Sequence, residues 1–144
     1  MKYVLIGVVL LLVLGVGAFF YLGQKSQSGE AAGLVDGRLS PCPSSPNCVS
    51  SEANTEDEKK VATLSSDSWA QIPGAITDMG GVVTTENATY IAAEFTSKTF
   101  KFVDDVEFRL AEDGVHVRSA SRVGYSDRGV NSARVAALRA KLDQ

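Results

Sequence analysis

The sequence is poor in the residues and motifs on which catalytic and metal sites are usually built. Its 144 residues include one histidine, His116, and two cysteines, Cys42 and Cys48. The glycine motifs that bind dinucleotides or nucleotide phosphates are missing, as are the Gly-x-Ser-x-Gly elbow of serine hydrolases and the Cys-x-x-Cys motif of thiol redox proteins. No second cysteine pair and no nearby histidine completes a four-ligand zinc site. We therefore expect no cofactor and no bound metal.

Charge is absent from the beginning of the chain. The run Tyr3–Leu22 contains no charged residue and is flanked by Lys2 and Lys25. A helix rising about 1.5 Å per residue would span the roughly 30 Å hydrocarbon core of a bilayer with such a run. Residues 1–25 are therefore expected to be an N-terminal membrane anchor that contacts the membrane through residues 3–22. The alternative is a cleaved signal peptide, although its apolar core would usually be shorter.

Basic character is also lacking in the rest of the chain. From Ser26 onward there are 12 lysines and arginines against 17 aspartates and glutamates. This acidic balance argues against nucleic-acid binding, which usually needs a basic surface. The polar, small residues of 26–37 predict a flexible linker. The remaining residues, 38–144, are expected to form one exported globular domain with a single core.

The two cysteines lie close together, in Cys-Pro-Ser-Ser-Pro-Asn-Cys from Cys42 to Cys48. Prolines in and before this loop restrict its backbone, so that the two thiols can meet in a disulfide. Two unrelated thiols are the alternative. Because disulfides persist outside the cytosol, the pair favours a C-terminal domain outside the cytoplasm. The charges that flank the anchor are nearly balanced and do not decide its orientation. The cysteines therefore decide it, and we expect the periplasmic side of a bacterial inner membrane.

The periodicity of the folded part predicts a mixed structure. An apolar stripe at helical spacing follows the helix-start signal Ser65-Ser66-Asp67 and is interrupted by Pro73-Gly74, where a kink or a break is expected. A second helix is expected to begin at Asn131, a good N-cap. Strand periodicity is found at 60–64, 82–86, 89–95, 101–110 and 115–118. These elements predict an α+β fold: an N-terminal transmembrane helix, then a small antiparallel sheet with two helices on one face and water on the other.

Polar residues alternate with apolar ones in residues 101–118. Glu107 and Arg118 fall on neighbouring strands and on the same polar face, so that a cross-strand ion pair is expected. Asp104 and Asp105 are consecutive and point to opposite faces, which weakens a hydrolase mechanism that needs two carboxylates. His116 has no nucleophile motif near it and is expected at the surface.

The most polar segment is Arg118–Asn131, which contains three arginines, three serines and Tyr125. It leads from a strand end into a helix N-terminus, where free N–H groups and guanidinium groups bind anions. The competing interpretation is that the arginines pair with the protein's own carboxylates. No residue is assigned a catalytic role. The candidate ligand-binding residues are Asp105, Arg118, Arg122, Tyr125, Asp127 and Asn131.

Three stretches carry a resemblance to a known family. They are Leu39–Ser51, Phe102–Phe108, and Arg118–Asp127 with Gly129–Asn131. Together they resemble the signature of the family filed as domain of unknown function 1499, over residues 37–144. Arg128 stands where a more apolar residue is expected. The resemblance implies a bacterial or plastid protein that is often exported or membrane-tethered, and it implies no established activity. It also implies that one cluster is formed by Asn47, Asp104, Asp105, Arg118, Arg122, Tyr125, Asp127 and Asn131.

Three functions remain open at this stage. The leading hypothesis is a membrane-anchored, non-catalytic envelope domain that binds an anionic small molecule, a lipid headgroup or an envelope protein through Arg118–Asn131. The second is a hydrolase-like enzyme that uses an aspartate or His116 beside the arginines. The third is a structural component of an envelope assembly, whose arginines only hold its own loops.

Overall fold

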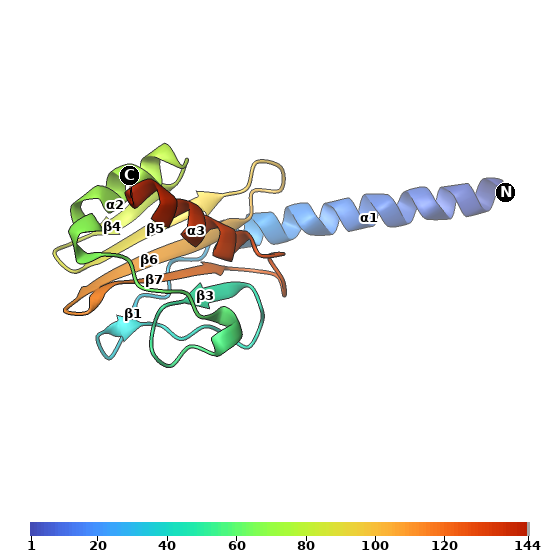
Figure 1. Ribbon diagram of the computed structural model, residues 1–144. Coiled ribbons are helices and arrows are strands. Elements are labelled where there is room, and N and C mark those ends of the chain that lie inside the picture. The colour runs from blue at the N-terminus through green and yellow to red at the C-terminus, as the bar shows by residue number, and fades with distance from the viewer. Residues whose placement is uncertain (144) are drawn as a thin grey trace.

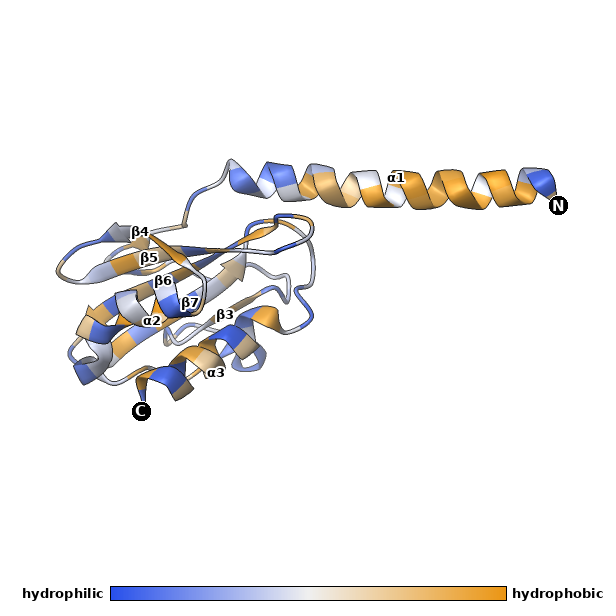
Figure 2. Cartoon of the chain, turned by 90° about the horizontal axis from the view of Figure 1, so that it is seen from above, coloured by the Kyte–Doolittle hydropathy of each residue, from blue (hydrophilic) through white to orange (hydrophobic). Residues whose placement is uncertain are grey.

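A long helix projects from a folded body that contains all other elements (Figure 1). The computed structural model describes residues 1–143. Helix α1 (Lys2–Gln27) is apolar along most of its length and polar at both ends (Figure 2). It is long and apolar enough to cross a membrane, and its apolar part is not buried in the folded body. The expected α+β class, with an apolar helix, antiparallel sheets and two further helices, is confirmed.

Five antiparallel strands form the main sheet, in the order β3-β7-β6-β5-β4. The long central hairpin of β6 and β7 turns at Glu112-Asp113, as the sequence predicted. Strand β4 contains a register shift between Val83 and Thr85. The strands are β3 (Cys48–Ser50), β4 (Val82–Glu86), β5 (Tyr90–Thr96), β6 (Val103–Ala111) and β7 (Gly114–Ser121).

The strand expected at 60–64 does not form. Lys60 makes a single parallel bridge to Ser50, and Leu64 makes a single antiparallel bridge to Val115. The two bridges lie on different strands, β3 and β7, so residues 60–64 do not pair continuously with either strand. The fifth strand is β3, which follows the cysteine loop, whose Cys42 and Cys48 form a disulfide.

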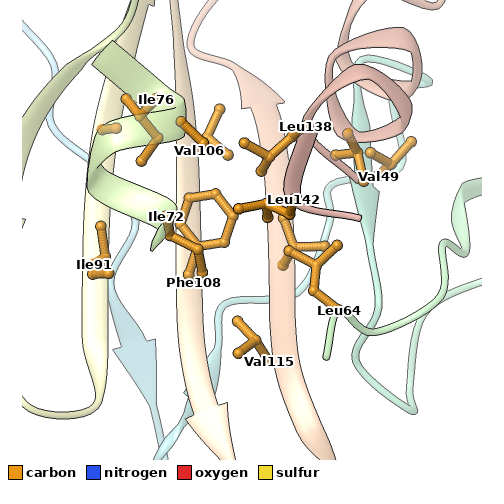
Figure 3. Packing of buried hydrophobic residues seen from close by; sticks show 14 residues of the cluster. Val49, Leu64, Ile72, Ile76, Ile91, Val106, Phe108, Val115, Leu138 and Leu142 are labelled. Atoms are coloured by element: carbon orange, nitrogen blue, oxygen red, sulfur yellow. The ribbon is translucent and has the colours of Figure 1, made fainter. Parts of the chain in front are cut away.

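One face of the sheet carries the helices and the hydrophobic core. The six-residue 3₁₀ helix η2 (Ser66–Gln71) leads into α2 (Ile72–Asp78), and α3 (Val130–Leu142) lies beside them. Pro73 stands in the first turn of α2, where a missing N–H removes no helical hydrogen bond, so the expected break lies at the junction of the two helices. The core includes the fully buried Ile72, Ile76 and Phe108 (Figure 3).

The opposite face is also covered, so the expectation that it is solvated was wrong. After α1 the chain folds back over this face and forms the hairpin of β1 (Leu34–Val35) and β2 (Arg38–Leu39). Leu39 is 2% exposed and packs with Tyr90 and Ala92. The sequence did not predict this cover because residues 26–37 have a linker-like composition. The boundaries expected at residues 25 and 37 stay predictions.

Helix α3 begins differently from the expectation. Its N-cap is Gly129, whose φ of 82° is in the left-handed region, and Asn131 lies inside the first turn. The carboxylate of Asp127 accepts hydrogen bonds from the backbone N–H groups of Gly129 and Asn131. Asp127 therefore caps the N-terminus of α3, and the side chain of Asn131 points into the protein.

Candidate functional site

Four of the six predicted site residues lie in two groups, on opposite faces of the sheet. Asp105, Arg118 and Arg122 are on the face covered by residues 29–40, whereas the side chain of Asn131 is on the helix face. Consecutive strand residues point to opposite faces, and this alternation separates the two groups. We call the first group, with its partners, the charged layer; its members are Glu52, Glu94, Asp105, Glu107, Arg109, Arg118 and Arg122.

Arg122 is the most highly bonded residue of the charged layer. Its Nε and Nη2 donate to the two carboxylate oxygens of Asp105, at 2.8 and 2.6 Å. Nη2 also donates to Glu94 at 2.5 Å, and Nη1 donates to the backbone oxygen of Ser26 at 3.1 Å. The hydrogen bonds to Asp105 raise the pKa of Arg122, burial opposes this, and Glu94 raises the pKa further. The guanidinium is therefore charged at every physiological pH, and its Nε, Nη1 and Nη2 each donate a hydrogen bond within the protein.

Ser26 connects this arginine to the last turn of α1. Its Oγ donates to the carbonyl of Gly23 at 2.6 Å and accepts the N–H of Val103 at 3.0 Å. The carbonyl that Arg122 contacts belongs to the C-terminal end of a helix, where partial negative charge attracts a cation. The end of α1 is thus bonded both to strand β6 and to the charged layer.

Glu107 holds the centre of the layer and is fully buried. Its Oε2 accepts from Arg118 at 2.8 Å, which confirms the expected cross-strand pair. Its Oε1 accepts from the hydroxyl of Tyr90 at 2.8 Å and from the N–H of Gly33 at 2.7 Å. Burial raises the pKa of Tyr90, and so do the charge and the hydrogen bond of Glu107. The Nε of Arg118 is a buried donor without a hydrogen-bond partner in the described chain.

Glu52 lies in the charged layer at the end that is farthest from α1. Arg109 donates to both its oxygens, at 3.0 and 3.2 Å, and the N–H of Leu39 donates at 3.0 Å. Burial alone would raise the pKa of Glu52, but the hydrogen bonds from Arg109 and Leu39 and the charge of His116 lower it below its ordinary value. A third basic residue, Arg38, lies 3.6 Å away.

His116 is buried, so its expected surface position was wrong. Its Nδ1 lies 3.3 Å from Ser51 Oγ, and its Nε2 lies 3.1 Å from Asp113. The hydrogen bond lowers the pKa of the exposed Asp113 carboxyl. The imidazole is thus bonded on both sides, and the residue is 5% exposed.

Asn131 organises a separate centre on the helix face of the sheet. Its Oδ1 accepts from Ser119 Oγ at 2.6 Å, and its Nδ2 donates to the carbonyl of Asn47 at 3.1 Å. Arg134 donates to the same Oδ1 at 2.6 Å and pairs with Asp104, also at 2.6 Å. This centre joins α3 to strands β6 and β7 and to the chain just before β3.

Two predicted site residues lie outside both the charged layer and the centre around Asn131. Tyr125 is 77% exposed in the loop between β7 and α3, and Asp127 bonds the start of α3. Sequence reasoning missed four residues. In or beside the charged layer these are Ser26, Glu52 and Glu94, and on the helix face the missed residue is Arg134. Strand periodicity placed Glu107 beside Arg118, but no local pattern indicates which segment covers that face.

The charged layer is chemically closed. Each of its carboxylates is bonded to a guanidinium group, and backbone N–H groups supply additional donors to Glu52 and Glu107. Within residues 1–143, no group of three or more His, Cys, Asp or Glu residues is placed to hold a metal ion. This arrangement can fix the covering segment to the sheet, whereas ligand binding by its arginines stays a prediction.

The comparison with protein-family models supports the resemblance seen in the sequence. The model described as "Protein of unknown function (DUF1499)" matches residues 38–142, which include the whole five-stranded sheet and exclude α1. No curated protein and no solved structure matches the chain.

Removal of one partner from the central pair is expected to destabilise the domain. In Arg118→Met, the buried carboxylate of Glu107 loses its positively charged partner. The free energy of unfolding should therefore fall by about 3–5 kcal/mol. Replacement of the exposed Arg128 by Gln should change it by less than about 0.5 kcal/mol. Urea unfolding of the full-length chain in detergent, followed by Trp69 fluorescence, measures both.

The double variant Arg118→Met/Glu107→Gln tests whether the unpaired charge is the cause. Gln keeps an acceptor for Tyr90 and Gly33 but removes the charge, so a large part of the lost stability should return. If the double variant is as unstable as Arg118→Met, or if the single variant loses less than about 1 kcal/mol, the pair does not act as described.

Stability should depend on pH through Glu52. Its folded-state pKa is lowered, so the stabilisation is present above the ordinary value of 4.5 and is lost as pH falls through the folded-state pKa. The difference in unfolding free energy between the wild type and Glu52→Gln should therefore be largest above pH 4.5 and shrink as the pH falls below it. Glu86→Gln, at an exposed position, should differ from the wild type in unfolding free energy by the same amount at every pH. A constant difference for Glu52→Gln would contradict the assignment.

Proposed function

From the premise that the chain belongs to the DUF1499 family, whose description assigns no activity, we propose a membrane-anchored, non-catalytic envelope module. In this proposal α1 stays in the membrane as a single span, and the domain binds its ligand or partner outside the cytoplasm. The observation that carries the proposal is the bonding of Arg122, which joins the sheet to the backbone of Ser26 at the end of the apolar helix.

The contacts of α1 support an uncleaved anchor over a signal peptide. Phe19 and Phe20 pack on Phe100, with ring centroids 5.3 and 5.1 Å apart. Cleavage after Ala18 would leave these two aromatic rings at a new terminus in water. The helix approaches the β5–β6 loop closely at Gly23, because a Cβ at this position would overlap the carbonyl of Phe100.

The charged layer supports a non-catalytic module over a hydrolase. A catalytic carboxylate needs access to a substrate, but both oxygens of Asp105 are bonded to Arg122 and the side chain is buried. His116 is equally enclosed. The arginines thus fit the structural interpretation, in which they hold the protein's own segments.

What remains for a partner is the exposed part of the segment Arg118–Asn131. Tyr125 is 77% exposed, Val130 is 49% exposed, and Arg128 carries no ion pair in residues 1–143. Exposed aromatic and arginine side chains are the residue types that contribute most to binding at interfaces. An anionic ligand, a lipid headgroup or an envelope protein would therefore meet the domain at residues 124–130.

The disulfide supports the proposed side of the membrane. Cys42 and Cys48 are bonded, and such bonds persist in the periplasm and other oxidising compartments. We infer a domain on the periplasmic side of a bacterial inner membrane, with the N-terminus in the cytoplasm.

Anchoring and sidedness can be tested together. In a bacterial host, the full-length chain with a C-terminal reporter that is active only in the periplasm should be active, sediment with membranes and retain its N-terminal residues. Leu11→Arg/Leu12→Arg places two charges mid-span and should release the chain from the membrane or prevent export. Leu34→Arg, at an exposed position in the β1–β2 hairpin, should behave as the wild type. A soluble wild-type chain cleaved near Ala18, or a cytoplasmic C-terminus, would contradict the proposal.

A further inference from the structure

The end of the sheet from which α1 emerges is defined by hydrogen bonds. Thr96 at the end of β5 is paired with Val103 at the start of β6. Val103 in turn accepts the N–H of Arg122 and donates to Ser26 Oγ. The β5–β6 loop and the β7–α3 loop therefore lie at the same end of the sheet as the exit of α1 (Figure 1).

The β5–β6 loop, residues 97–102, packs against the helix. The loop is closed by two hydrogen bonds between Ser97 and Phe102, at 2.8 and 2.9 Å. From it, Phe100 contacts Phe19 and Phe20, and Phe102 lies 6.3 Å from Phe19 between ring centroids. The loop is thus fixed on the side of the apolar helix, not merely near it.

This contact determines the depth of the loop if α1 spans a bilayer. Phe19 and Phe20 precede Leu22, the last residue of the uncharged run, by three and two positions. At about 1.5 Å per residue, the ring of Phe100 lies about 3–5 Å on the membrane side of Leu22. That is the level of the bilayer interface, where aromatic side chains are enriched.

Basic groups surround the same place. Lys25, Lys98 and Lys101 are exposed, and none has an ion pair in the described chain, although the protein as a whole has a net charge of −3. A groove of about 470 Å³ lies between helix and loop. Its walls combine the aromatic rings of Phe20 and Phe100 with polar groups of Gln24 and Lys101. Aromatic rings together with ammonium groups that have no ion pair match the boundary between acyl chains and phosphates.

We propose that the β5–β6 loop and the exit of α1 form a phospholipid-binding site. Phe100 inserts at the interface of the bilayer, and Lys98 and Lys101 bind the phosphates of anionic phospholipids. The bilayer is the occupant because the groove is continuous with the proposed transmembrane helix. This inference rests on the membrane anchoring proposed above and adds a second contact between the domain and the membrane.

The test uses the full-length chain in vesicles of phosphatidylcholine and phosphatidylglycerol. In a Trp69→Phe background, single tryptophans are placed by Phe100→Trp, Tyr21→Trp and Ala88→Trp, the last in the exposed β4–β5 turn at the opposite end of the sheet. Phospholipids brominated close to the headgroup should quench Phe100→Trp and Tyr21→Trp and leave Ala88→Trp unquenched. Phe100→Trp should also emit at shorter wavelength than Ala88→Trp.

The outcomes separate the two proposals. If Tyr21→Trp is quenched and Phe100→Trp is not, α1 is in the bilayer and the lipid-binding loop is refuted. If neither is quenched, both the anchor and the loop site are refuted. If Ala88→Trp is quenched equally, the domain lies flat on the membrane without the proposed orientation, and the loop site is again refuted.

The role of the lysines is tested by the choice of brominated lipid. With Phe100→Trp, brominated phosphatidylglycerol should quench more strongly than brominated phosphatidylcholine at equal content. Lys98→Gln/Lys101→Gln should bring the ratio close to one, whereas Lys60→Gln, an exposed lysine outside the loop, should leave it unchanged. Two results would overturn binding of the phosphates by Lys98 and Lys101. The first is a quenching ratio of one with both lysines present, and the second is a ratio above one that is unchanged in the double variant.

Discussion

The structure depends on one buried guanidinium group. Arg122 bonds Asp105 on the neighbouring strand, Glu94 one strand further away, and the carbonyl of Ser26 at the end of α1. A buried charge is tolerated only where partners satisfy it, so this arginine requires all three to be in place. The direction in which α1 leaves the domain and the path of the chain after it follow from this requirement.

The charged layer extends this principle across the sheet. Glu107 accepts the N–H of Gly33 and Glu52 accepts the N–H of Leu39, so the covering segment is held by carboxylates that are themselves bonded to arginines. The layer therefore replaces a second hydrophobic core, of which only a small cluster around Leu39 is present. Arg118 and Arg122, which belong to the segment expected to bind an anion, are bonded to the protein's own carboxylates. Anion binding by this segment stays a prediction.

The sequence predicted what depends on local patterns. The strands at 82–86 and 101–110, the turn at Glu112-Asp113 and the pair of Glu107 and Arg118 follow from two-residue alternation and turn chemistry, and they are confirmed. It did not predict the covered second face, because residues 26–37 resemble a linker and Gly33 is held through its backbone N–H. The start of α3 was misplaced because Asp127 and Asn131 are both good capping residues, and only the burial of Asn131 decides between them.

The central claim is that α1 and the domain form one rigid body held by Arg122. Nitroxide labels at Leu12→Cys and Ala88→Cys, positions that are both exposed, report their separation by double electron–electron resonance of the full-length chain in vesicles. The account predicts a single narrow distance distribution that broadens strongly in Arg122→Ala. A broad distribution in the chain that retains Arg122 would show that the helix moves freely and would contradict the account.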